Sequence, residues 1–279
     1  MERKVIRQVT GYKTTDGAGV NLVRVLSRNT VADFDPILML DSFDSVNPRD
    51  YIAGFPLHPH RGIETISYIY RGKMVHKDSL GNQDMITDGE VQWMTAGSGI
   101  MHEERLPASE RMLGVQLWLN LAAKDKMVAP AYLSVKADQI KDVTLPNGKL
   151  RVLAGSYEGV KSYQSKYQPL DYYDIHLDSH SSFTVKTDSR RSIMLFTLIG
   201  SIVVEGVSIQ EKTAAKLSGG DTLTIKTESD KAQVLFVSSI ALNEPVSWGG
   251  PIVMNTKEEL YRAFQDLDEG TFLKQGIKY

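Results

Sequence analysis

The stretch Phe55-Pro-Leu-His-Pro-His-Arg-Gly-Ile-Glu-Thr-Ile-Ser-Tyr-Ile-Tyr70 combines a strand signal with a closely spaced pair of histidines. Residues 62–70 are rich in β-branched and aromatic side chains, which favour an extended chain. Before this run, His58 and His60 stand two residues apart. In an extended segment this spacing places both imidazoles on one face. The stretch therefore predicts a β-strand architecture that presents a histidine pair to one side.

Short strands and turns alternate on the C-terminal side of this stretch. Residues 71–73 have the composition of a turn, residues 74–79 that of the returning strand, and residues 80–83 that of the next turn. A further strand is expected at residues 91–94. Short strands at this density are typical of an all-β sandwich or barrel.

A second pair of polar side chains with the same spacing follows in the segment Gly97-Ser-Gly-Ile-Met-His-Glu-Glu104. Two such pairs on neighbouring strands can bring three imidazoles and one carboxylate to a single point. A divalent first-row metal accepts this ligand set while keeping coordination positions open. The sequence therefore predicts a metal site made by His58, His60, His102 and Glu104.

The composition limits the partners of the chain and the donor atoms of this site. The 32 Lys and Arg residues are dispersed among 34 Asp and Glu residues, so there is no basic stripe for nucleic acid or an anionic membrane. Because the chain has no cysteine, any metal must be held by nitrogen and oxygen donors. The charged N-terminal segment lacks the apolar core of a signal peptide, and we expect a cytoplasmic protein.

A hairpin signal lies in the second half of the chain. Pro146-Asn-Gly148 separates two runs with strand composition, residues 143–145 and 150–153. Because Asn-Gly tolerates positive φ angles, we expect a type I′ turn between two antiparallel strands.

One helix is expected, near the C-terminus. Thr256 and Glu259 form a capping box, and apolar side chains repeat at i, i+4 and i+7 from Leu260. Gly270 follows at a position where helices commonly end. The sequence therefore predicts a short helix that packs on a barrel face.

A weak internal repeat indicates that the chain contains one fold twice. Residues 196–204 resemble residues 68–76, and residues 217–225 resemble residues 86–94. The polar stretch 134–141 separates the two copies.

The repeat predicts two domains with different metal content. We expect an N-terminal metal-binding domain at residues 1–134 and a degenerate C-terminal domain at residues 135–279. The alignment of the two copies places Lys186 and Asp188 near the positions of the histidine pair. Since a lysine cannot act as a ligand until it loses its proton, the C-terminal domain is expected to bind no metal.

The chain also resembles a known family through three motifs. The segments His58-Pro-His-Arg-Gly-Ile-Glu-Thr65 and Gln92-Trp-Met-Thr-Ala-Gly-Ser-Gly-Ile-Met-His102 resemble the pirin family of the cupin superfamily, and Glu244-Pro-Val-Ser-Trp-Gly-Gly-Pro-Ile-Val-Met-Asn255 is similar to its C-terminal signature. This resemblance implies a bicupin, an all-β fold of two antiparallel jelly-roll barrels, with one mononuclear metal in the N-terminal barrel. The family's ligands fall on the four residues named above.

Four other residues are candidates for the surroundings of the metal. Glu64 stands where many cupins place a carboxylate ligand, but we favour a hydrogen-bonding or ion-pairing role beside the site. His76 follows the first hairpin turn and can face the cavity, but we favour an ordinary strand residue. Gln116 and Trp93 belong to segments that approach the site, although for Trp93 we favour ordinary barrel core.

The resemblance also implies a metal and a reaction. The metal is usually iron, here expected as Fe(II), although nitrogen and oxygen donors alone do not distinguish it from manganese, nickel, copper or cobalt. The reaction is flavonol 2,3-dioxygenation, in which O₂ opens a ring of a quercetin-like aromatic substrate and carbon monoxide is released. Glu104 is then the candidate general base for the substrate's 3-hydroxyl. A monomer is expected.

Two other functions are compatible with the same motifs. A pirin-like protein can be a regulator whose metal senses redox state and whose surface binds a transcription factor or a metabolic enzyme. A storage-type cupin is less consistent with the sequence, because such proteins have usually lost the ligand set that is intact here.

Overall fold

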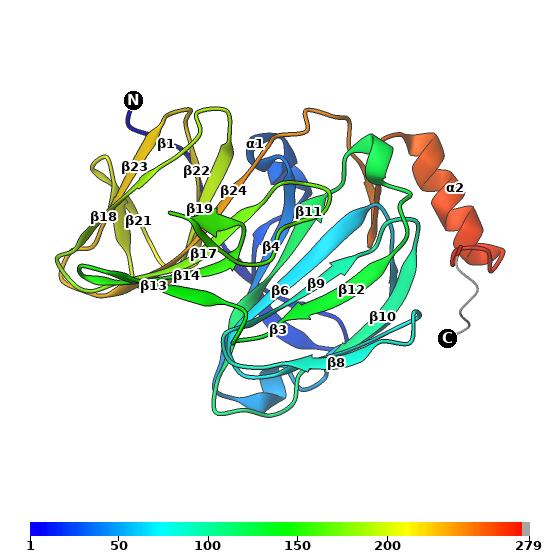
Figure 1. Ribbon diagram of the computed structural model, residues 1–279. Helices are drawn as coiled ribbons and strands as arrows, with labels where there is room; N and C mark the ends of the chain where they lie inside the picture. Colours follow the sequence, from blue (N-terminus) through cyan, green and yellow to red (C-terminus); the bar gives the residue numbers. More distant parts are fainter. Residues whose placement is uncertain (275–279) are drawn as a thin grey trace. The chain divides into compact units, whose positions relative to one another are not determined.

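The computed structural model describes residues 1–274, which form two compact units, here called the N-barrel and the C-barrel (Figure 1). The C-barrel comprises Met1–Tyr12, Val25–Pro36 and Asp138–Ala241. The N-barrel comprises Lys13–Arg24, Ile37–Ala137 and the described residues from Leu242 onward. This division differs from the expected single cut after residue 134, because each end of the chain packs with the unit formed mainly by the opposite half.

Each unit has a larger and a smaller antiparallel sheet, and in the N-barrel the smaller sheet carries the histidine motifs. The larger sheet of the N-barrel has the order β12 (Ala131–Val135), β9 (Glu90–Thr95), β6 (Ile63–Arg71), β11 (Met112–Asn120), β4 (Ile37–Ser45), β3 (Val20–Leu26) and β2 (Tyr12–Asp16). Its smaller sheet has the order β5 (Phe55–His60), β10 (Ile100–Arg105), β7 (Met74–Asp78) and β8 (Gln83–Ile86).

The C-barrel repeats this arrangement. Its larger sheet has the order β1 (Val5–Thr10), β22 (Thr213–Leu217), β19 (Ser192–Ile199), β24 (Ala232–Ser239), β17 (Asp171–Leu177), β14 (Gly148–Ala154) and β13 (Lys141–Leu145). Its smaller sheet has the order β18 (Ser182–Lys186), β23 (Thr222–Lys226), β20 (Ile202–Val204) and β21 (Val207–Ile209). The predicted all-β class with a duplicated antiparallel barrel is confirmed.

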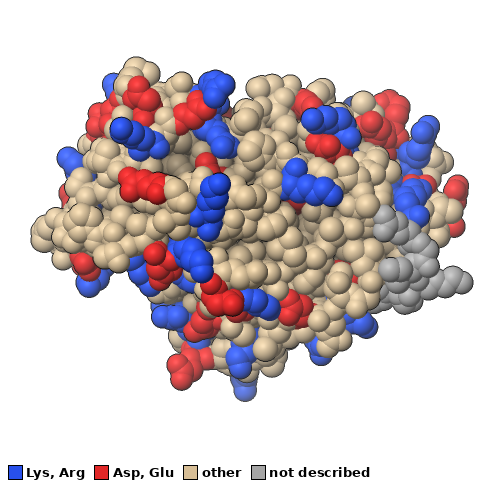
Figure 2. Space-filling view, in the orientation of Figure 1, with Lys and Arg blue, Asp and Glu red and all other residues tan. Residues whose placement is uncertain are grey.

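The remaining elements are short. They are η1 (Arg28–Thr30), α1 (Val31–Phe34), η2 (Pro48–Asp50), η3 (Ala123–Asp125), and the strand pairs β15 (Ser156–Tyr157) with β16 (Val160–Lys161) and β25 (Ser247–Gly249) with β26 (Ile252–Met254). In the described part of the chain, no helix has both the length and the apolar character needed to cross a membrane. Figure 2 shows Lys and Arg side chains interspersed with Asp and Glu over the face in view.

The strand order corrects one half of the predicted repeat. Residues 196–204 fall on β19 and β20, which correspond in sheet position to β6 and β7, as the alignment expects. Residues 217–225, however, run from β22 into β23, and β23 corresponds to β10 and not to β9. The alignment is wrong there because a turn that contains glycine and an acidic residue precedes both β9 and β23. The counterpart of the His102 strand is therefore β23.

The hairpin at residue 146 forms, but with a different turn. Strands β13 and β14 pair antiparallel with Leu145 opposite Gly148, so Pro146 and Asn147 make the loop. A type I′ turn needs positive φ at both loop residues, and the proline ring holds φ near about −65°. Neither loop residue has positive φ, whereas Gly148 has φ 150°. The prediction of a hairpin is confirmed and the prediction of its turn type is wrong.

The C-terminal helix α2 (Lys257–Asp268) has the predicted cap. The hydroxyl of Thr256 accepts from the Glu259 amide at 3.1 Å, and the Glu259 carboxylate accepts from the Thr256 amide at 2.9 Å. Gly270 follows the helix with φ 70°. Ala263 is buried in a small core with Ile252 and other apolar residues, so α2 packs on the β25–β26 hairpin.

The two barrels differ in what fills them. In the C-barrel the buried positions of β18 and β23 are apolar, with Val185 opposite Leu223 and Phe183 opposite Ile225. In the N-barrel the corresponding strands β5 and β10 place His58 opposite His102. The N-barrel interior therefore contains a polar region that has no equivalent on the matching strands of the C-barrel.

Candidate metal centre

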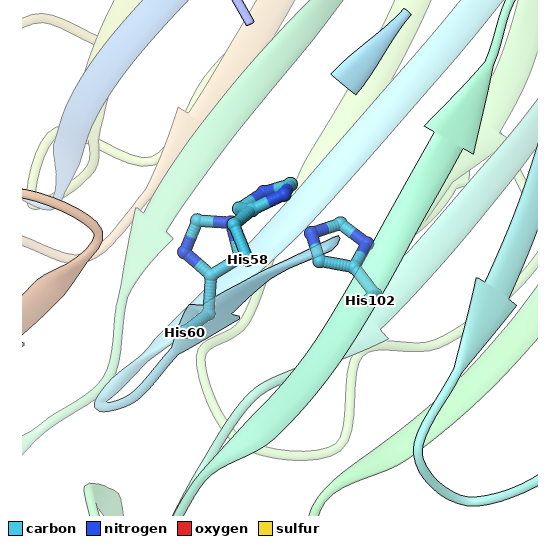
Figure 3. A group of neighbouring side chains, drawn as sticks. All are labelled: His58, His60 and His102. Atoms are coloured by element: carbon cyan, nitrogen blue, oxygen red, sulfur yellow. The ribbon is translucent and has the colours of Figure 1, made fainter. Parts of the chain in front are cut away.

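Three histidines meet where β5 and β10 pair. His58 and His60 end β5, and His102 lies on β10 directly opposite His58. The ring centroids are 4.8 Å apart for His58 and His60, 4.3 Å for His58 and His102, and 5.0 Å for His60 and His102. One nitrogen from each ring lies within 4.8 Å of the other two, and Figure 3 shows the rings turned toward one another. The cluster could hold a metal ion.

Hydrogen bonds determine which ring nitrogens of the first pair carry protons. Nδ1 of His58 is 2.8 Å from the carbonyl oxygen of Pro56, and Nδ1 of His60 is 2.9 Å from that of Pro251. Because a carbonyl oxygen only accepts, each Nδ1 donates and each neutral ring keeps a lone pair on Nε2. The two Nε2 atoms lie 3.1 Å apart, a distance at which two lone pairs repel unless a cation is near both.

A second set of contacts orients His102. Nε2 of His76 donates to the Asp78 carboxylate at 2.9 Å, so Nδ1 of His76 is the acceptor that faces Nδ1 of His102 at 3.5 Å. Nε2 of His102 is buried and has no hydrogen-bond partner among residues 1–274. An orphaned buried nitrogen beside two opposed lone pairs fits a metal-binding donor set.

Burial favours the neutral form of two of the rings, those of His60 and His102. Burial, reinforced by the nearby His58, lowers the pKa of His60 to about 3. The same two causes lower the pKa of His102, with further contributions from His60 and His76. Neutral imidazoles are the form that binds a metal.

Glu104 lies on the same strand but is held by amide groups. Its carboxylate Oε1 accepts from Gln92 at 2.5 Å, and Gln116 donates to Oε1 at 3.1 Å and to Oε2 at 3.0 Å. Glu104 is two residues beyond His102 and faces the same side of β10. Within the described residues, the group of mutually close donor atoms consists of the three histidines without Glu104.

The four surrounding candidates divide into two sets. Gln116 binds Glu104, and His76 contacts His102 and stacks on Tyr132 with ring centroids 4.0 Å apart and an interplanar angle of 9°. Both therefore lie around the cluster, in the interior of the N-barrel.

Glu64 and Trp93 instead bind each other. Trp93 donates from Nε1 to Glu64 at 3.0 Å, and the Thr95 hydroxyl donates to the same oxygen at 2.7 Å. Trp93 follows Gln92, and neighbours on a strand face opposite sides, so the Glu64–Trp93 pair lies on the face of its sheet that points away from Glu104. Burial raises the pKa of Glu64, against the effect of its two hydrogen bonds.

Four contributors to the site have no place among the sequence candidates. Gln92 binds Glu104, Asp78 binds His76, the Pro251 carbonyl binds His60, and the Trp118 ring stands 5.0 Å from the His60 ring at 85°. Strand alternation from Gln116 would have indicated Trp118, which lies two residues later on the same face. The Pro251 contact leaves no such signal, because it joins backbone to side chain over a separation of 191 residues.

Two family models match most of the chain. Residues 19–119 match the family model described as Pirin, and residues 172–273 match the model described as Pirin C-terminal cupin domain. A pirin-like protein of Caulobacter vibrioides is 39% identical over 275 residues, which cover 97% of this chain and 99% of that protein.

Two further relatives extend the comparison. Pirin of Homo sapiens is 33% identical over 270 residues, which cover 95% of this chain and 92% of that protein. The crystal structure of a quercetin 2,3-dioxygenase from Acinetobacter baumannii is 32% identical, with a TM-score of 0.90 over 98% of this chain and 99% of that chain. With both family models matched in order and relatives similar along nearly its full length, the chain belongs to the pirin family of cupin-fold proteins.

Proposed function

We propose that this chain is a dioxygenase that opens flavonols such as quercetin with O₂, using one divalent metal, Fe(II), held by His58, His60, His102 and Glu104. The observation that carries the proposal is the convergence of three imidazole rings, two with opposed Nε2 atoms and one with a buried Nε2 that has no hydrogen-bond partner among the described residues. The similarity to a solved quercetin 2,3-dioxygenase over nearly the whole chain supports the substrate class.

The donor set determines what a bound metal contributes. Held by three neutral nitrogens and one carboxylate, a divalent metal would act as a Lewis acid and a template, lowering the pKa of a substrate hydroxyl. The chain's own contribution to the proton transfer is Glu104. Its carboxylate is buried and accepts hydrogen bonds from the amide groups of Gln92 and Gln116, which fix its direction. In this proposal Glu104 takes the proton of the 3-hydroxyl.

Aromatic side chains beside the cluster suit a planar substrate. The rings of Trp118 and Trp248 have centroids 5.6 Å apart, and Trp118 contacts the ring of His60 edge-on. Offset or tilted stacking on such rings is favourable for a flavonol. We assign these two tryptophans to substrate positioning.

We also infer that only the N-barrel holds a metal. On the matching strands of the C-barrel, Val185 and Leu223 form the opposed inner pair, and neither side chain can donate to a metal. This supports the assignment of one metal per chain.

The proposed activity is tested by oxygen uptake. Protein of measured metal content is given quercetin in an oxygen electrode, with detection of carbon monoxide, and a His58→Ala variant is compared with the wild type. His180→Asn is the matched control, since it removes an imidazole from the C-barrel at a position with φ 51° that asparagine tolerates. We expect uptake by the wild type and the control and none by His58→Ala. Metal-loaded wild type without uptake would contradict the proposal and favour a redox-sensing regulator.

A further inference from the structure

The ring of His60 is oriented by a carbonyl from the C-terminal part of the chain. Its Nδ1 donates to Pro251, whereas Nδ1 of His58 donates to Pro56, two residues away. Pro251 lies in the turn between β25 and β26, which are three residues long each. A two-stranded hairpin of this size does not hold its shape alone. The position of the Pro251 carbonyl therefore depends on what the hairpin is attached to.

Backbone contacts attach β26 to the residues that directly follow His60. The Val253 amide donates to the Arg61 carbonyl at 3.1 Å, and Arg61 and Ile252 form a parallel bridge. A Cβ at Gly62 would stand 2.0 Å from the Val253 carbonyl oxygen, so only glycine permits this approach. The end of β5 and strand β26 thus lie backbone against backbone.

A buried lysine ties the same two segments together. Lys126 is 1% exposed, and its ammonium donates to the carbonyls of Gly62 at 2.8 Å and Val253 at 3.1 Å and to the Asn120 side chain at 2.7 Å. Three acceptors use all three N–H donors of the ammonium. Because the Gly62 and Val253 carbonyls belong to the two segments in contact, Lys126 stabilises the contact between the end of β5 and β26.

A buried arginine connects helix α2 to both histidine motifs. Arg61 is 2% exposed and donates to the Asp266 carboxylate on α2 at 2.7 Å and to the Phe272 carbonyl at 2.9 Å. Its Nε donates at 2.7 Å to the carbonyl of Ser98, in the loop that leads into the His102 strand. One side chain next to His60 therefore fixes α2, the end of β5 and the start of β10 relative to one another.

We propose that Ser247–Phe272, the C-terminal clasp, is a positioning element of the metal centre. Through the Pro251 carbonyl it selects the Nδ1–H tautomer of His60 and sets the angle of the ring, and Arg61 and Lys126 keep that carbonyl in place. The inference rests on the proposed metal site and assigns positioning roles to Arg61, Lys126 and Asp266, which act on a metal through His60. Loosening the clasp should weaken metal binding while the barrel stays folded.

The test uses Co(II) as the metal and the full chain. Asp266→Asn removes the charge that faces Arg61, and Lys126→Met removes the ammonium while keeping a long side chain. Asp44→Asn is the matched control, because it removes the carboxylate partner of Arg111, 2.8 Å away, in the same unit. Affinity is measured by competition with a chromogenic chelator. Solvent exchange of the paramagnetically shifted His60 Nδ1–H proton is measured by NMR, because a purely structural role would not single out this proton.

We expect both clasp variants to weaken Co(II) binding by about 10- to 100-fold, as is usual for residues that orient metal-binding histidines. The His60 proton should exchange faster while that of His58 does not, and Asp44→Asn should match the wild type. Wild-type affinity and exchange in folded Asp266→Asn would overturn the inference, and this variant decides alone if Lys126→Met does not fold. Failure of the wild type to bind Co(II) would instead overturn the proposed metal site.

Discussion

Nδ1 of His76 lies 3.5 Å from Nδ1 of His102, and the opposite nitrogen of His76 donates to Asp78 at 2.9 Å. The Asp78 carboxylate is also bound by the Asn82 side chain, and although burial opposes its ionisation, the hydrogen bonds from His76 and Asn82 lower the pKa of Asp78. Asp78, His76 and His102 form a row of hydrogen-bonding groups. The fixed Asp78 carboxylate at one end determines which ring nitrogens of the two histidines carry protons. The result is a lone pair on Nε2 of His102, which is the atom that faces the other two histidines.

Replacing His76 should therefore weaken metal binding. In His76→Leu the Nδ1–H of His102 loses its acceptor, and we expect the affinity for Co(II) or Ni(II) to fall by about tenfold or more. Tyr132→Phe serves as the control, because it keeps the ring stacked on His76 and removes only the hydroxyl. Equal affinity of His76→Leu and wild type in a chelator competition would show that His76 and Asp78 have no influence on metal binding by His102.

Glu104→Gln should abolish most of the flavonol turnover. General-base catalysis usually contributes about 10²- to 10⁴-fold, so the rate per bound metal should fall by at least about a hundredfold. The steady-state rate is measured by loss of flavonol absorbance, with metal content determined for each sample. A variant that retains the wild-type rate per metal would remove Glu104 from the role of base.

The metal-free protein should become less stable in acid because of His60. Its pKa is about 3 in the folded chain against 6.5 for an ordinary histidine. Between these values the unfolded state binds more protons than the folded state, so the free energy of unfolding decreases as the pH falls. The contribution of His60 is fully present above about pH 6.5 and is lost at up to about 1.4 kcal/mol per pH unit below it.

Urea denaturation of the metal-free chain at several pH values measures this slope. His60→Gln should have a shallower decline between about pH 6.5 and pH 4, whereas His180→Asn should keep the wild-type decline. Identical slopes for His60→Gln and wild type would mean that the buried ring does not drive the acid sensitivity.

The effects of backbone strain and of steric contact can be separated with two glycines, Gly97 in the loop before β10 and Gly81 in the turn between β7 and β8. Gly97 has φ 49° and a Cβ there would stand 2.2 Å from the Val128 carbonyl oxygen, whereas Gly81 has φ 87° with nothing within 4 Å of its Cβ position. Gly81→Ala should cost about 1–2 kcal/mol from the left-handed backbone alone. Gly97→Ala should cost about 3 kcal/mol or more, because displacement of the Val128 carbonyl adds to the strain. Equal losses in urea denaturation would contradict the steric account.

The convergence of the three histidines could be predicted because it depends on local geometry. In a strand, residues two apart share a face, so the spacing of His58 and His60 already directs both rings to one side. The surroundings of Glu104 could not be predicted in the same way. Gln92 and Trp93 are adjacent, so they face opposite sides of the strand. The local composition does not reveal which of the two faces the barrel interior.

The packing of each end of the chain with the unit formed mainly by the opposite half could not be predicted from the sequence either. It depends on pairings between distant residues, such as Val5 with Leu217 in the C-barrel and Arg61 with Ile252 in the N-barrel. Such pairings leave no periodicity in the segments themselves. The hairpin at Asn147 shows the opposite case, in which one neighbour, Pro146, was enough to exclude the expected turn type.

The position of a bound metal shows whether the three histidines form the metal centre. Crystals of the full chain loaded with Co(II) should give one anomalous peak per chain, about 2.1 Å from Nε2 of His58, His60 and His102. An anomalous map with no peak at these three nitrogens, or with the metal bound elsewhere in the chain, would contradict the account.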